Sequence, residues 1–187
     1  MRHRTLGVAI AALAFPVLAG GVGANDENVD QDHGRPARIF RAVLLGTNEV
    51  PPISTGGHGR LRLELNRDET NIHFELSYQD LEGTPASVAH VHFAPSNVNG
   101  MVMFFMCGGG PAATPCPPSG TLEGDITAAD IVGPAAQGIT PGEFAEVVKA
   151  LRAGLAYGNV HNAAIAGDTR PSFPGGQVRG QLVPSRR

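Results

Sequence analysis

Two neighbouring stretches of the chain alternate strictly between apolar and polar residues. Leu61, Leu63 and Leu65 take every second position of the first stretch, and apolar side chains do the same over residues 72–78. A period of two places the apolar side chains on one face of a β-strand. The polar link between the two stretches, residues 67–69, is typical of a hairpin turn. The pattern therefore predicts two paired strands with one buried face.

Glycine and proline are unusually frequent in the rest of the chain. The 187 residues include 25 glycines and 15 prolines, roughly a fifth of the total against an average near 12%. Both residues disfavour helix interiors, which excludes a helical bundle, while a hydrophobic content of 42% is enough for a core. Together with the two alternating stretches, further short apolar runs separated by turns predict about seven or eight strands in all. These runs are 39–46, 87–94, 101–106, 119–131, 156–163 and 176–183. We expect an all-β fold, an antiparallel Greek-key-like sandwich or barrel.

One segment breaks the β pattern. Thr140 is suited to an N-cap, Pro141 to the first helical position, and Glu143 to the third position of a capping box. Apolar residues then recur at helical spacing up to a stop at Gly154, namely Phe144, Val147, Val148 and Leu151. The sequence predicts one short crossover helix over about residues 141–153.

The first residues resemble a secretory signal. Arg2 and Arg4 precede an apolar stretch that is shorter than a membrane span, and Val22 and Ala24 fit a small-residue cleavage site. We therefore predict a signal peptide over 1–24, a flexible polar lead-in over 25–37 and a β domain over 38–184. The mature protein would be exported, periplasmic or extracellular, with no membrane span after cleavage.

Export would place the two cysteines of the chain in an oxidising compartment. Cys107 and Cys116 flank a loop rich in glycine and proline. In an oxidising compartment such a pair forms a disulfide that closes a small loop. A thiolate metal pair or a redox pair is less favoured, because the CxxC spacing is absent.

Four segments together resemble the CHRD domain, first named from chordin. They are NEVPP at 48–52, AHVHFAP at 89–95 followed by Asn99-Gly100, LRAGLAYGNVHN at 151–162 and PGGQVRGQL at 174–182. The resemblance covers about residues 38–184 and is to the single-domain proteins exported by bacteria. It implies a secreted all-β module and no settled activity. The cysteine-bearing insertion 107–118 and the loop 163–173 depart from the family pattern.

Histidines are the residues that best suit a site. His90 and His92 lie two apart on a predicted strand and share a face, and His161 lies on a later strand. If these strands pack together, three imidazoles converge on a copper or zinc ion, with His58 as a candidate fourth ligand. The layout is similar to that of copper/zinc superoxide dismutase. The alternative is structural, with the imidazoles bonding loop carbonyls.

Arg179 lies in an apolar neighbourhood of the last long strand. A guanidinium in such surroundings needs a carboxylate partner. Glu49 in the NEVPP segment is the predicted partner, in a structural ion pair.

Net charge and the absence of common catalytic motifs reduce the number of functions that the sequence favours. A formal net charge of -3 gives no electrostatic basis for binding nucleic acid. The chain lacks the GxSxG, HExxH and phosphate-loop motifs, so the sequence favours a protein that is not an enzyme. Two hypotheses remain open. One is a binding or structural module that recognises a protein or cell-envelope partner through its loops. The other is a copper- or zinc-binding protein.

Overall fold

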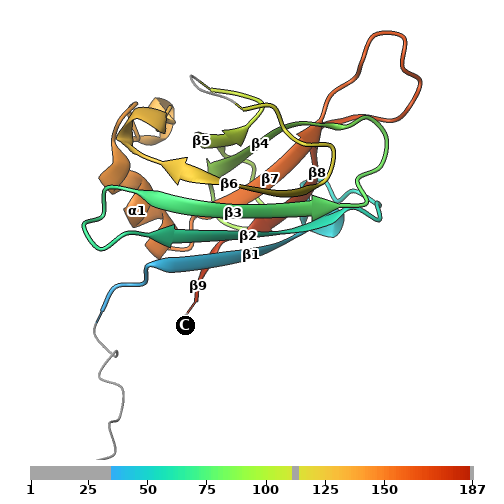
Figure 1. Cartoon of the computed structure of the whole chain (residues 1–187). Coiled ribbons are helices and arrows are strands. Elements are labelled where there is room, and N and C mark those ends of the chain that lie inside the picture. Colours follow the sequence, from blue (N-terminus) through green and yellow to red (C-terminus); the bar gives the residue numbers. More distant parts are fainter. Residues whose placement is uncertain (1–34, 111–113, 186–187) are drawn as a thin grey trace, which may run out of the picture. The chain divides into compact units, whose positions relative to one another are not determined.

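The computed structural model describes residues 35–110 and 114–185, and this part of the chain forms one antiparallel β-sheet with a single α-helix (Figure 1). The predicted signal peptide 1–24 and most of the lead-in 25–37 lie outside the described residues. The strands are β1 (Ile39–Leu45), β2 (His58–Leu65), β3 (Ile72–Gln79), β4 (Ala86–Phe93), β5 (Met101–Cys107), β6 (Gly120–Ile126), β7 (Ala156–Asn162), β8 (Phe173–Gln181) and β9 (Val183–Pro184).

The sheet curls into a nearly closed barrel, which confirms the predicted all-β class. The strand order is β5-β4-β7-β8-β1-β2-β3-β6, and the short β9 pairs with β1. The two edge strands are β5 and β6. The chain after β6 returns to β5, where the Val132 amide donates to the Met103 carbonyl at 2.9 Å. The two ends of the sheet are thus linked by a loop contact.

The alternating stretches form the β2–β3 hairpin as predicted. Leu61 faces Leu76 and Leu63 faces Phe74 across the two strands, and all four side chains are buried. The polar positions point outward, where Arg62 pairs with Glu75 at 3.2 Å. The two-residue period therefore fixed the register and the buried face of this half of the barrel.

The helix exists but begins later than expected. Helix α1 covers Phe144–Arg152, and the residue before it is Glu143. Gly142 has a φ of +88°, which a right-handed helix does not allow, and its amide donates to the Ile131 carbonyl instead. The Glu143 carboxylate still accepts the Thr140 amide at 2.6 Å. Half of the predicted capping box is present, and it stabilises a turn rather than the first helical turn.

The far end of α1 agrees with the prediction. Gly154 has a φ of +69°, its amide donates to Leu151, and the Leu155 amide donates to Ala150. This pair of hydrogen bonds is a Schellman motif, which satisfies the last carbonyl groups of the helix. The helix buries its apolar face at one end of the barrel (Figure 1), with Phe144, Val147, Val148 and Leu151.

A disulfide joins Cys107 at the end of β5 to Cys116, as the sequence predicted. The two Cα atoms are 5.0 Å apart, within the usual range for such a bond. None of the helices in the described ranges has the length and apolar character needed to cross a membrane.

Candidate metal centre

Strands β4, β7 and β8 lie side by side and carry polar residues on the face that points away from the barrel core. In the β4–β7 pair His90 faces Asn159 and His92 faces Tyr157, and in the β7–β8 pair Asn159 faces Arg179. The residues between them, such as Ala89, Val91 and Val160, enter the core. We call the outward set, together with Glu49, the polar layer: Glu49, His90, His92, Tyr157, Asn159, His161 and Arg179.

The three predicted histidines meet within this layer. The His90 ring centroid lies 4.3 Å from that of His92 and 4.5 Å from that of His161. One ring nitrogen of each residue lies within 4.8 Å of the other two. Strand pairing between β4 and β7 thus brings together side chains about 70 residues apart in the sequence.

Hydrogen bonds fix the orientation of two of the rings. His92 Nδ1 donates to the Gly100 carbonyl at 3.0 Å, and His161 Nδ1 donates to the Pro174 carbonyl at 2.9 Å. A carbonyl can only accept, so each neutral ring carries its proton on Nδ1 and a lone pair on Nε2. Backbone carbonyls are common partners of the second nitrogen of metal-binding histidines.

The remaining nitrogens are buried and have no partner. His90 Nδ1, His92 Nε2 and His161 Nε2 make no hydrogen bond in the structure. His90 and His161 are only 6% and 8% exposed. Buried polar atoms are almost always hydrogen-bonded, so three such atoms in one place require an explanation.

Burial also keeps the three imidazoles neutral. Loss of solvation lowers the pKa of His90 to about 2 and that of His92 to about 4, and it lowers the pKa of His161 as well. The neighbouring imidazoles add to the effect on His90. Neutral imidazole is the form that coordinates a metal ion.

Hydrogen bonds from two loops cover the polar layer and join it to the NEVPP segment. Asn99 donates through Nδ2 to the Val50 carbonyl at 3.0 Å and accepts from Arg179 through Oδ1 at 2.9 Å. The next residue, Gly100, donates its amide to the Tyr157 hydroxyl at 3.2 Å. The NEVPP segment, the Asn99-Gly100 turn and strands β7 and β8 therefore form one structural unit around the histidines.

Glu49 and Arg179 are both buried in this layer, but they are not joined by an ion pair among the described residues. Glu49 accepts two hydrogen bonds from Asn159 Nδ2, at 3.0 and 3.1 Å. Arg179 bonds to Asn99 and to the Pro95 and Val98 carbonyls, and lies 3.5 Å above the Tyr157 ring. Carbonyl and amide acceptors take the place of the predicted carboxylate.

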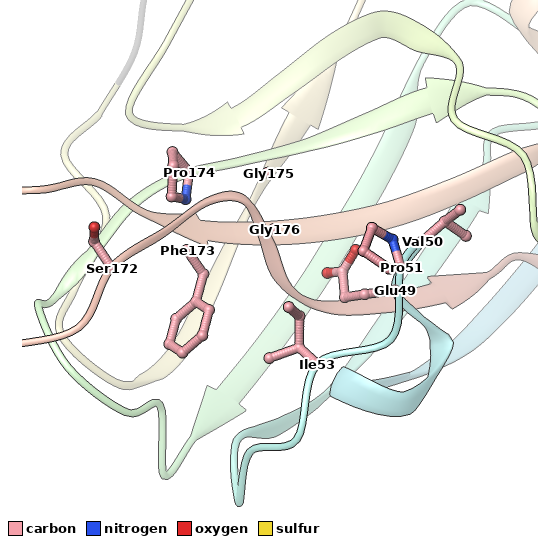
Figure 2. Close-up of a pocket in the computed structure, with 9 residues that line it drawn as sticks. All are labelled: Glu49, Val50, Pro51, Ile53, Ser172, Phe173, Pro174, Gly175 and Gly176. Atoms are coloured by element: carbon pink, nitrogen blue, oxygen red, sulfur yellow. The ribbon is translucent and has the colours of Figure 1, made fainter.

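A pocket of about 250 Å³ opens beside Glu49. Figure 2 shows the Glu49 side chain among residues 49–53, which follow β1, and residues 172–176 at the start of β8. Burial raises the pKa of this carboxyl to about 7, although the Asn159 hydrogen bond and the charge of Arg179 oppose the rise. Pro174, whose carbonyl holds His161, also lines the pocket.

The predicted fourth ligand, His58, lies elsewhere. His58, at the start of β2, contacts the Gly56 carbonyl at 3.1 Å and the Gln79 amide at 2.9 Å, and does not belong to the group formed by His90, His92 and His161. The histidine group in the described residues therefore has three members, without the predicted fourth.

Sequence reasoning missed several residues of the centre. Tyr157 stacks on His92 with ring centroids 4.5 Å apart, and Phe105 of β5 packs edge-on against His90 at 5.4 Å. Tyr157, Asn159 and His161 alternate along β7, so the two-residue period could have revealed the first two. The Pro174 and Gly100 carbonyls had no readable signal, because backbone acceptors leave no mark on the residue type.

The arrangement defines a class: a β-barrel domain with a buried cluster of three histidines on its outer face. The chain matches the family model of the CHRD domain over residues 40–182, and it therefore belongs to the CHRD family. Membership supports a non-catalytic module. CHRD domains are extracellular, and the Cys107–Cys116 disulfide fits an exported protein. No curated protein and no solved structure matches the chain.

Proposed function

We propose that this protein is an exported CHRD module that binds one copper or zinc ion through His90, His92 and His161. One observation carries the proposal: a ring nitrogen of each histidine lies within 4.8 Å of one in each of the other two, in a cluster where every ring has one buried nitrogen without a partner. Imidazole nitrogen suits both metals.

A purely structural role accounts for only part of this geometry. The contacts of His92 with Gly100 and of His161 with Pro174 would tie the turn before β5 and the start of β8 to strands β4 and β7. They use one nitrogen of each ring and leave the other buried without a partner, which costs roughly 1–3 kcal/mol for each atom. An ion bound between the three nitrogens would remove that cost.

The predicted signal peptide 1–24 and the disulfide support a location outside the cytoplasm, periplasmic or extracellular. There the module would bind and hold the metal. Recognition of a protein or cell-envelope partner through the loops stays a prediction.

Elemental analysis of protein purified from the exported, oxidised state tests the proposal. We expect close to one copper or zinc per chain, either as isolated or after titration followed by desalting. His161→Ala should lose the metal. His73→Ala is the matched control, because His73 lies on the exposed face of β3 and contacts Asp125. A wild-type protein that stays free of metal after titration, or a His161→Ala variant that keeps it, would contradict the proposal.

A further inference from the structure

The charge around the three histidines is unusual for a site that holds a divalent ion. All three ligands are neutral, and the metal-ligating group contains no carboxylate or thiolate. Arg179 is 2% exposed and lies over Tyr157, which in turn stacks on His92. A permanent positive charge thus lies one aromatic ring away from a ligand.

Counter-charge is scarce in the same region. Among the buried residues that the structure describes, Glu49 is the one acid. Its carboxyl is held by Asn159 and is not a member of the histidine group. Burial raises its pKa to about 7, so near neutral pH much of it carries no charge.

Water is also excluded from the ligand atoms. The three free nitrogens are buried, with Phe105 packed against His90 and Tyr157 against His92. An ion there would lose its hydration shell, and the cost of that loss in a medium of low dielectric grows with the square of the ionic charge. A doubly charged ion therefore pays about four times as much as a singly charged one in this simple Born picture.

The number of ligands also favours a singly charged ion. Zinc sites are almost always four-coordinate and tetrahedral, with a water as the fourth ligand where the protein supplies three. Cuprous copper, by contrast, is stable with three ligands in a plane. Metal–nitrogen bonds of about 2.0 Å place three trigonal nitrogens roughly 3.5 Å apart. The ligand atoms lie within 4.8 Å of one another, so binding would draw them together by up to about 1.3 Å.

From the neutral ligands, the buried nitrogens and the nearby Arg179, we infer that the centre selects the singly charged cuprous ion over zinc and over cupric copper. This inference rests on the proposed function. It adds the oxidation state and the coordination number of the ion.

The test is competition under anaerobic conditions with the full exported chain. Cuprous ion buffered by bicinchoninate and zinc buffered by a zinc chelator give the two affinities. We expect cuprous affinity to exceed zinc affinity by at least about 100-fold. X-ray absorption of the copper form should show three nitrogen neighbours and no fourth light ligand. After exposure to air, the copper should stay silent in electron paramagnetic resonance.

The Glu49→Gln variant tests whether the Glu49 carboxylate supplies counter-charge to the ion. The cuprous affinity should change by less than about threefold, because the carboxyl is not a ligand and neutral Gln matches its protonated form. A tenfold or greater loss would show that Glu49 supplies the charge and would overturn the inference. Zinc affinity equal to or above cuprous affinity, a fourth ligand, or a stoichiometric cupric signal would overturn it too. Failure to bind either metal would instead contradict the proposed function.

Discussion

Histidines occur on both halves of the barrel, and the two groups differ in nearly every physical respect. His58 and His73, on β2 and β3, have side chains that are 45% and 41% exposed, and each lies near an aspartate. His90, His92 and His161 are largely shielded, and each has one nitrogen without a partner. The first group behaves as solvated surface, whereas the second has the features of a ligand set.

The difference comes from what covers each face. Loops containing Val50 and Asn99 fold over the outer side of β4, β7 and β8, where they bond to each other and to Arg179 of β8, and Pro174 at the start of β8 bonds to His161. On β3, the His73 ring contacts its cross-strand neighbour Asp125 at 3.2 Å, and its side chain stays 41% exposed. A histidine pair on a strand is therefore informative only when the fold also removes water from it.

The largest effect expected from this contrast is stabilisation by metal. A ligand at 100 times its dissociation constant raises the free energy of unfolding by about 2.7 kcal/mol. Wild type and His73→Ala should both gain this amount in denaturant unfolding, and His161→Ala should gain none. Equal stabilisation of all three proteins would place the metal outside the histidine centre.

The disulfide loop gives the next effect. Gly109 and Gly110 lie so close to the Phe105 ring that an added Cβ atom would be 2.5 and 2.9 Å from it, and Phe105 in turn packs on His90. Replacing Cys107 and Cys116 together by serine should cost roughly 2–3 kcal/mol of unfolding free energy. It should also weaken metal binding by about tenfold, as outer-shell changes do. An unchanged metal affinity would show that the loop does not help to cover the centre.

Glu49 predicts a pH dependence of stability in the metal-free protein. Its pKa is about 7 in the folded state and near 4.5 when unfolded, so the folded state holds the proton longer. The protonated carboxyl is favourable below pH 4.5, and this contribution is lost as the pH rises to about 7. The loss should amount to roughly 1–3 kcal/mol, since one pKa unit corresponds to about 1.4 kcal/mol.

Glu49→Gln is the variant that isolates this contribution. The difference in unfolding free energy between wild type and variant should change across pH 4.5–7 and stay flat above that window. A constant difference over the whole range would mean that Glu49 ionises as freely in the folded protein as in the unfolded chain.

The smallest effect is expected on the exposed half. His73→Ala removes a surface contact with Asp125, and such changes stay within about 0.5 kcal/mol. Thermal unfolding at neutral pH measures it. A loss of several kcal/mol would mean that the exposed histidines stabilise the fold, and the contrast between the two groups would weaken.

Much of the barrel could be predicted because its information is local. The alternation through Leu61 and Phe74 fixed two strands, and Gly154 ended the helix where expected. The helix start was wrong because nothing in the residue types between Thr140 and Glu143 shows that Gly142 adopts a positive φ. A capping box signature fits both a helix and a tight turn.

The histidine centre was predictable only in part. The residue types and the shared face of His90 and His92 were readable, but the meeting with His161 depends on the β4–β7 pairing, which no local pattern reveals. The acceptors of Arg179 were not predicted either, because they are the Asn99 side-chain amide and the Pro95 and Val98 carbonyls. Every residue has a backbone carbonyl, so the sequence does not show which carbonyl accepts a given hydrogen bond.

Anomalous X-ray diffraction from crystals grown with copper or zinc tests the central claim most directly. The account predicts one strong anomalous peak, at about 2.0–2.2 Å from His90 Nδ1, His92 Nε2 and His161 Nε2. Soaked crystals of His73→Ala should show the same peak. A peak only at the exposed histidines, or no peak between the three buried nitrogens, would contradict the account.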